Sequence, residues 1–174
     1  MVIWVIGLAG AGKTTLSQML YDEMKPKLNN LVLLDGDALR DVFNNDVDHS
    51  IEGRRKNAER LSNLSKFLSD QGIHVIASVL SIFPEWQKWN RENLPNYQQI
   101  HLDVSIDTLV KRNDRSFYQE ALDGKIQNVV GVDIDFPEPY CSDLVLDNNR
   151  EDADFRNYVE QVLKLEPVSN IYNV

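Results

Sequence analysis

One short glycine-rich stretch near the start of the chain limits its possible folds more than any other feature. Residues 7–14 read Gly-Leu-Ala-Gly-Ala-Gly-Lys-Thr, which matches the phosphate-binding pattern G-x-x-x-x-G-K-[ST]. An apolar, β-prone run precedes it at residues 2–6, and a helical apolar pattern follows it at Leu16, Leu20 and Met24. The strand, loop and helix context favours a phosphate loop over a chance glycine-rich turn.

The geometry of such a loop gives its residues their expected roles. Glycines let backbone N–H groups curl around an oxyanion, and the start of the next helix adds free N–H donors. We expect Lys13 to bridge the β- and γ-phosphates of a nucleotide and the hydroxyl of Thr14 to bind Mg²⁺. The predicted nucleotide-binding residues of this loop are Gly10, Ala11, Gly12, Lys13, Thr14 and Thr15.

Short apolar runs alternate with helical patterns along the chain. The alternation predicts an α/β fold of the P-loop NTPase type, a three-layer sandwich with a central parallel sheet. We expect a single domain over residues 1–174, with a mobile lid at about 112–130 and a loosely held polar tail at 166–174. The expected strands are residues 2–6, 31–34, 74–78, 99–104 and 144–146, the first four covered on both faces.

Composition excludes several classes of function. A formal net charge of −9 argues against nucleic acid as a partner, because binding a phosphate backbone requires a basic face. Cys141 is the only cysteine, so no internal disulfide can form, which fits a reducing cytoplasm. There is no apolar run long enough to span a membrane, and a core strand at residue 2 leaves no room for a signal peptide. We therefore expect a cytoplasmic protein that does not bind membranes.

Two carboxylates, Asp35 and Asp37, follow the second apolar run. In open parallel sheets, ligands bind beyond the carboxyl ends of the strands. Near a phosphate loop, two carboxylates there can hold a water on Mg²⁺ and take a proton from an attacking hydroxyl. The alternative is a turn in which an aspartate caps a helix beginning near Ala38. We predict that Asp37 accepts the proton and that Asp35 orients the metal-bound water.

Candidate groups for binding an acceptor come later in the chain. Arg54 and Asn57 lie three residues apart, on one face of the helix predicted at 51–71, and could bind an anion. The alternative for this basic cluster is a solvated face. Ser81 follows the third apolar run, where it could meet the acceptor or simply belong to a turn. The polar segment after residue 112 fits a lid that closes over phosphates, or a surface helical hairpin.

Taken in order, these motifs resemble the adenylylsulfate kinase family over residues 2 to about 150. The resemblance implies a kinase that moves the γ-phosphoryl of MgATP to the 3′-hydroxyl of a nucleotide ribose, with a homodimer as the common assembly. The motifs that carry it are the phosphate loop through Thr15, Leu34-Asp35-Gly36-Asp37 with Arg40, Arg54 with Asn57, Ser78-Val79-Leu80-Ser81, the segment 112–126 and Gly131-Val132-Asp133.

The resemblance also implies roles for single residues. Asp35 looks like the metal–water carboxylate and Asp37 like the acid–base group. Arg112 looks like the residue that lies against the ATP adenine, and Arg115 stands where the family often has a lid lysine. The acceptor-binding residues implied in this way are Arg40, Arg54, Asn57, Ser81, Arg115 and Val129.

The chain departs from the family pattern in its acceptor half. Two phenylalanines that sandwich the acceptor adenine in the family look replaced by His49 and Val129, and the family's Ser-Pro-Tyr-Arg becomes Ser-Ile-Phe-Pro at residues 81–84. Each lost stacking contact is worth about 1–3 kcal/mol by analogy with base stacking elsewhere. The change suggests a smaller base, as in cytidine diphosphoramidate, which relatives of this family phosphorylate in bacterial surface-polysaccharide (capsule) pathways.

Two alternatives stay open at this point. One is a true adenylylsulfate kinase, which would make 3′-phosphoadenylylsulfate in sulfate assimilation. The other belongs to a different class, a nucleotide-binding regulatory module without transfer activity. The chain lacks the D-x-x-G and N-K-x-D motifs that GTP switches use, which favours a kinase.

Overall fold

Strands and helices alternate along the chain, as the apolar runs predicted. The computed structural model describes residues 1–112, 117–150 and 153–173. The strands are β1 (Val2–Ile6), β2 (Leu31–Asp35), β3 (His74–Val79), β4 (Tyr97–Asp103) and β5 (Leu144–Asp147). The helices are α1 (Lys13–Met24), α2 (Gly36–Val42), α3 (Ile51–Asp70), α4 (Pro84–Asn93), α5 (Ile106–Arg112), α6 (Phe117–Leu122), α7 (Phe155–Lys164) and α8 (Val168–Tyr172).

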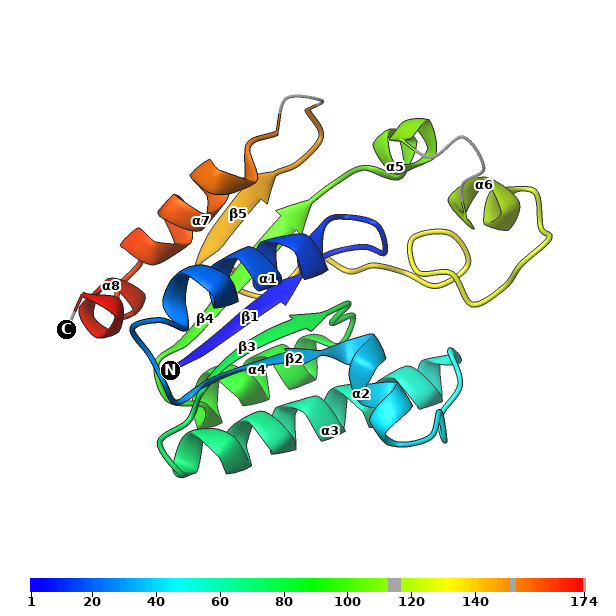
Figure 1. The fold of residues 1–174 in the computed structure, drawn as a ribbon. Helices are drawn as coiled ribbons and strands as arrows, with labels where there is room; N and C mark the ends of the chain where they lie inside the picture. The colour runs from blue at the N-terminus through cyan, green and yellow to red at the C-terminus, as the bar shows by residue number, and fades with distance from the viewer. Residues whose placement is uncertain (113–116, 151–152, 174) are drawn as a thin grey trace.

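The five strands form one parallel sheet in the order β2-β3-β1-β4-β5. α1 and α7 lie on one face of the sheet, and α3 and α4 lie on the other (Figure 1). This is the predicted α/β sandwich of three layers. Because all strands run the same way, the loops that follow β1, β2 and β3 emerge at the same edge of the sheet.

The central strand β1 divides the core between the two faces. Ile3 and Val5 point into the cluster that includes the buried residues of α1 and α7, whereas Val2, Trp4 and Ile6 point into the cluster with Leu61 of α3. All five residues of β1 are buried. Successive side chains of a strand point to opposite faces, so a strand covered on both sides is apolar throughout.

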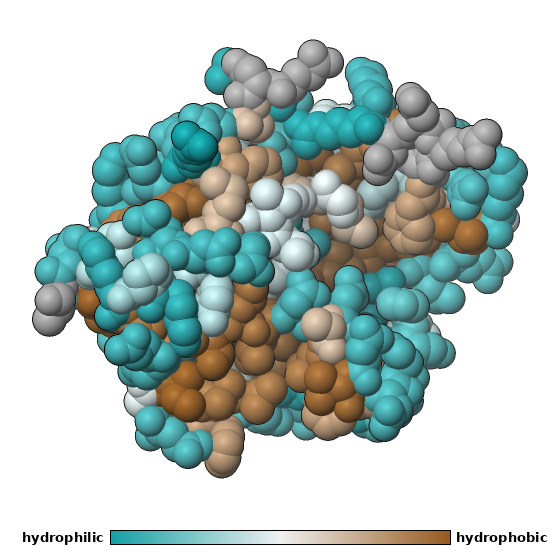
Figure 2. All heavy atoms as spheres, in the orientation of Figure 1, coloured by the Kyte–Doolittle hydropathy of each residue, from teal (hydrophilic) through white to brown (hydrophobic). Residues whose placement is uncertain are grey.

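Two parts of the fold differ from the expectation. β2 is an edge strand, and only Leu31 of its five residues is fully buried. Apolar side chains gather on the lower part of the surface, over the region of β2 and α3 (Figure 2). The C-terminal segment is not loose along its whole length, because residues 168–172 form α8 and Val168 is completely buried. Among the described residues, no helix is both long enough and apolar enough to cross a membrane.

Candidate active site

The phosphate loop joins β1 to α1, and contacts from distant segments hold it. Gly12 has a φ of +94°, and a Cβ at this position would lie 2.6 Å from Cζ of Phe155, so only glycine fits. The Nδ2 group of Asn148 donates to the carbonyl of Ala11 at 2.9 Å, and the hydroxyl of Tyr118 donates to the carbonyl of Ala9 at 3.0 Å. The loop is therefore fixed from the end of β5 and from α6.

Lys13 lies half-buried at the start of α1, beside the two predicted catalytic carboxylates. Its Nζ donates to the carbonyl of Leu8 at 2.8 Å. Burial lowers the pKa of Lys13 to about 8, although the nearby carboxylates of Asp37 and Asp35 act in the opposite direction. A poorly solvated ammonium group is well suited to bind a triphosphate, because its attraction to anions is weakly screened.

This pKa predicts that nucleotide affinity depends on pH. A bound triphosphate stabilises the protonated form of Lys13 and raises its pKa, so affinity is fully present below pH 8. Above pH 8, free protein must take up a proton to bind, and affinity should fall by up to about tenfold per pH unit. Calorimetric titration with an ATP analogue between pH 7 and 9.5 measures this slope (about 1.4 kcal/mol per tenfold change).

Lys13→Arg is the matched control, because a guanidinium group stays protonated throughout this range. Its affinity should change little with pH. Equal slopes for the two proteins would show that the pH dependence does not come from Lys13.

Asp35 caps α2, as in the alternative interpretation of this aspartate, and its carboxylate also contacts the phosphate loop. Its Oδ1 accepts hydrogen bonds from the backbone N–H groups of Asp37 and Ala38, at 2.9 and 3.3 Å, and so caps α2. Its Oδ2 accepts a hydrogen bond from the hydroxyl of Thr14 at 3.1 Å. The cap fixes the carboxylate in an orientation that brings its second oxygen to the phosphate loop.

The oxygens of Thr14 and Asp35 fit a magnesium ion that arrives with a nucleotide. Hydroxyl and carboxylate oxygens are the donors that Mg²⁺ prefers, and this ion usually takes its other ligands from phosphates and water. Among residues 1–112, 117–150 and 153–173, no group of three or more His, Cys, Asp or Glu side chains could hold a metal on its own. The site thus fits a metal shared with the substrate better than a resident metal.

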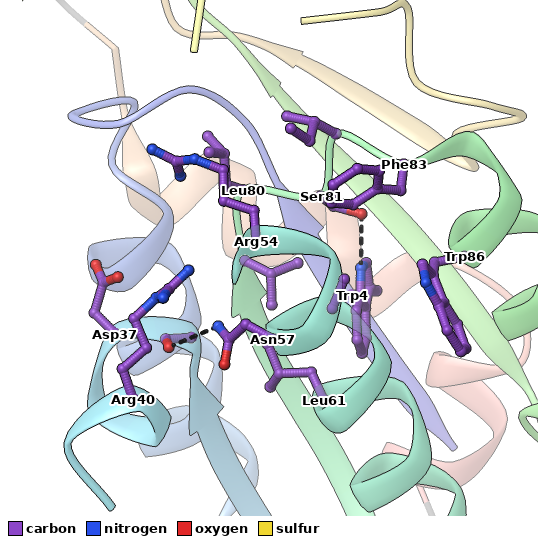
Figure 3. Close-up of a pocket in the computed structure, with 14 residues that line it drawn as sticks. Trp4, Asp37, Arg40, Arg54, Asn57, Leu61, Leu80, Ser81, Phe83 and Trp86 are labelled. Carbon is purple, nitrogen blue, oxygen red and sulfur yellow. Dashed lines mark hydrogen bonds between the residues drawn. The ribbon is translucent and has the colours of Figure 1, made fainter. Parts of the chain in front are cut away.

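Two cavities meet at Asp37. A cleft of about 510 Å³ runs along the phosphate loop and is lined by Lys13, Thr14, Asp35 and Asp37. A smaller inner pocket of about 70 Å³ has a polar mouth and an apolar interior (Figure 3). The residues that line both cavities are Gly36, Asp37, Arg54, Val79 and Leu80. Asp37 therefore lies between the phosphate-loop cleft and the inner pocket.

Two arginines surround the mouth of the inner pocket. The Nη1 of Arg40 donates to the carbonyls of Val47 and Asp48, each at 3.0 Å, and Arg40 is 6% exposed. The guanidinium of Arg54 donates to the carbonyls of His49 and Asn128, each at 2.8 Å. The two arginines thus hold the loops at residues 47–49 and 128 through backbone carbonyls, and they also place positive charge at the mouth of the pocket.

That positive charge affects the neighbouring ionisable groups. Burial, followed by the charge of Arg40, lowers the pKa of Arg54. Partial burial, followed by Arg40 and Arg54, also lowers the pKa of His49, which lines the cleft. His49 is therefore predominantly neutral near pH 7, and the mouth of the pocket is suited to an anion through its arginines.

Asn57 and Ser81, two of the predicted acceptor-binding residues, both line the inner pocket (Figure 3). The Nδ2 group of Asn57 donates to the carbonyl of Gly36 at 3.2 Å, which ties α3 to the start of α2. The hydroxyl of Ser81 accepts a hydrogen bond from the indole Nε1–H of Trp4 at 3.3 Å. This hydrogen bond ties the loop after β3 to β1.

Two further predicted residues, Val129 and Arg112, do not line this pocket. Val129 is 1% exposed and packs in the core, because Asp133 accepts hydrogen bonds from the backbone N–H groups of Asn128 and Val129 and turns this segment inward. Arg112 donates to the carbonyls of Asn148 and Arg150, at 2.6 and 2.9 Å, on the side of β5. The contribution of Arg115 to the acceptor site lies outside the described residues.

The comparisons with known proteins agree with this geometry. A phosphate loop facing carboxylates at the edge of a parallel sheet, with a second pocket beside it, defines a P-loop kinase, a phosphotransferase that acts on a hydroxyl group. The chain belongs to the adenylylsulphate kinase family, whose family model matches residues 1–147.

Individual relatives carry two different names within this family. The chain is 40% identical over 164 residues to the cytidine diphosphoramidate kinase of Campylobacter jejuni, covering 94% of this chain and 92% of that protein. It is 32% identical over 149 residues to the adenylyl-sulfate kinase of Deinococcus deserti, covering 86% of this chain and 82% of that protein. The fold is similar to that of Mycobacterium tuberculosis APS kinase CysC in complex with AMPPNP and APS, with a TM-score of 0.81. The two sequences are 25% identical, and the match covers 93% of this chain and 94% of that chain.

Proposed function

We propose that this protein transfers the γ-phosphoryl group of ATP to the ribose 3′-hydroxyl of a cytidine nucleotide such as cytidine diphosphoramidate. The position of Asp37, where the phosphate-loop cleft meets the inner pocket, carries the proposal that two substrates react here. The 40% identity to a cytidine diphosphoramidate kinase supports this acceptor over adenylylsulfate. The corresponding pathway would be surface-polysaccharide modification in the cytoplasm, with the protein acting as a homodimer.

In the proposed reaction, the backbone N–H groups of the phosphate loop and the ammonium of Lys13 hold the triphosphate. Asp37 accepts the proton of the ribose 3′-hydroxyl as its oxygen attacks the γ-phosphorus, and ADP leaves. Mg²⁺, held by Thr14 and through a water by Asp35, would neutralise charge on the phosphates. Arg40 and Arg54 would bind the anionic part of the acceptor, and Arg112 would lie against the ATP adenine.

The two positions where the family pattern has stacking phenylalanines favour a small base over a sandwiched purine in this chain. His49 is exposed at the cleft, and Val129 is turned into the core. Neither position offers the pair of aromatic faces that a sandwiched adenine requires. Each missing face lowers purine binding by about 1–3 kcal/mol, whereas a pyrimidine has less ring surface to cover.

Acceptor-dependent release of ADP tests this proposal. With MgATP present, we expect saturable turnover of cytidine diphosphoramidate, with a kcat/KM at least about tenfold above that for adenylylsulfate, the effect of one lost stacking contact. Phosphorus NMR of the product should place the new phosphate on the 3′-hydroxyl. Efficient turnover of adenylylsulfate alone would identify a true adenylylsulfate kinase. ATP binding without acceptor-dependent ADP release would instead favour a regulatory module.

A further inference from the structure

The loop after β3 holds one residue in an unfavourable backbone conformation at the wall of the inner pocket. Ser81 has a φ of 56°, in the left-handed region that residues with a side chain rarely adopt. Ser81 lines the pocket together with Leu80 and Ile82. Strained residues of this kind persist only where surrounding contacts hold them, and they cluster at functional sites.

Two buried side chains from other elements hold Ser81. Trp4 of β1 donates from its indole to the Ser81 hydroxyl, as Figure 3 shows. Gln87 of α4 donates from Nε2 to the Ser81 carbonyl at 2.7 Å. Trp4 is 2% exposed and Gln87 is 1% exposed, so water does not compete effectively for either hydrogen bond.

The amide of Gln87 has only one possible orientation. Its Oε1 accepts a hydrogen bond from the backbone N–H of Tyr140 at 2.7 Å and another from Nε2 of Gln99 at 3.4 Å. A backbone N–H can only donate, so the oxygen of Gln87 must face Tyr140 and its NH₂ group must face Ser81. Gln99 also donates to the carbonyl of Tyr140 at 2.8 Å. Gln87 thus ties the loop after β3 to the segment before β5.

We propose that Gln87 is a positioning residue for acceptor binding. Its side chain holds the Ser81 backbone in the left-handed conformation and so keeps the wall of the inner pocket preformed. Binding of the acceptor then does not have to offset the entropy lost when a flexible loop becomes ordered. The inference rests on the proposed function only in assigning this pocket to the acceptor. Gln87 does not itself line the pocket, so its effect passes through Ser81.

Substitutions of Gln87 should therefore affect the acceptor and spare ATP. Gln87→Leu removes the donor, and Gln87→Glu keeps an oxygen for Tyr140 but turns an oxygen toward the Ser81 carbonyl. Loss of one hydrogen bond to a buried carbonyl lowers kcat/KM for the acceptor by about tenfold in both variants. The KM for ATP should stay within about twofold, because the hydrogen bonds of Gln87 reach Ser81, Tyr140 and Gln99 rather than the phosphate loop.

Gln98→Leu is the matched control. Gln98 is 9% exposed on β4, and its Nε2 donates to the adjacent carbonyl of Tyr97. In this variant, kcat/KM for the acceptor and the KM for ATP should both stay near the wild-type values. If the Gln87 variants raised the KM for ATP as strongly as they lowered kcat/KM for the acceptor, or if Gln98→Leu gave the same acceptor defect, the positioning role would be wrong.

A measurement without any substrate separates this inference from the proposed function. The indole Nε1–H resonance of Trp4, assigned with Trp4→Phe, reports on the hydroxyl of Ser81. In ¹H–¹⁵N spectra it should shift in both Gln87 variants and stay in place in Gln98→Leu. Failure of every acceptor with the wild-type protein would overturn the proposed function alone. Unchanged Trp4 and Ser81 signals in Gln87→Leu would overturn the role of Gln87, whatever the acceptor.

Discussion

Asp37→Asn should lower kcat by about 10²–10⁴-fold, the range expected when a general base is removed. The amide has the size and shape of the carboxylate, but it cannot take the proton of the attacking hydroxyl. Among the described residues, Asp37 is the one carboxylate that lines both the phosphate-loop cleft and the inner pocket. ATP affinity, measured by calorimetry well below pH 8, should stay within about threefold of wild type, less than one conventional hydrogen bond.

The pH of the binding measurement matters because the negative charge of Asp37 raises the pKa of Lys13. Without that carboxylate, the pKa of Lys13 falls further, so binding measured near or above pH 8 would mix two effects. Asp41→Asn is the matched control on the same helix. Asp41 is exposed and accepts a hydrogen bond from Asn45 at 3.0 Å, and this variant should keep wild-type turnover. Undiminished turnover in Asp37→Asn would remove Asp37 from the mechanism.

Lys13→Met should lower kcat/KM for ATP by about 10²–10³-fold while leaving the fold at least as stable. The loss is that expected for removing one preorganised donor that stabilises charge developing in the transition state. The stability expectation follows from the lowered pKa, because burial penalises the charged form of Lys13 in the folded protein. Below pH 8 the ammonium costs folding free energy, and an apolar side chain of similar length removes that cost.

Thermal unfolding measured beside steady-state kinetics checks both halves of this expectation. Lys66→Met is the control, because Lys66 is partly exposed on α3, where it pairs with Asp70 at 2.5 Å. That variant should keep full activity. A large drop in the unfolding temperature of Lys13→Met, parallel to its loss of activity, would mean that Lys13 holds the fold rather than the nucleotide.

The sequence predicted the fold well where local signals coincide with long-range packing. β1 was expected at residues 2–6 and occurs there, because an apolar strand runs directly into the glycines of the phosphate loop. The long helix expected at 51–71 spans Ile51–Asp70 and ends just before Gly72, whose φ is +78°. The exposure of β2 was not predictable, because the order of strands in the sheet determines which of them lies at an edge.

The site was predictable only in part, because hydrogen bonds from distant segments hold the loops around it. The phosphate loop and Asp35-Gly36-Asp37 carry recognisable patterns. Asn148 and Gln87 do not, since an isolated asparagine or glutamine gives no sign that it will bind a backbone carbonyl in another loop. The two interpretations of Asp35, a helix cap and a catalytic carboxylate, were treated as alternatives, yet its two oxygens allow both roles at once.

A crystal structure with a non-hydrolysable ATP analogue, Mg²⁺ and cytidine diphosphoramidate would show directly whether the two substrates meet at Asp37. The proposed mechanism predicts that the triphosphate lies within the loop of residues 7–14, with Lys13 moved from the Leu8 carbonyl to the β- and γ-phosphates. It also predicts that a carboxylate oxygen of Asp37 lies within hydrogen-bond distance of the ribose 3′-hydroxyl. A triphosphate bound elsewhere, or Asp37 turned away from the sugar, would contradict this mechanism.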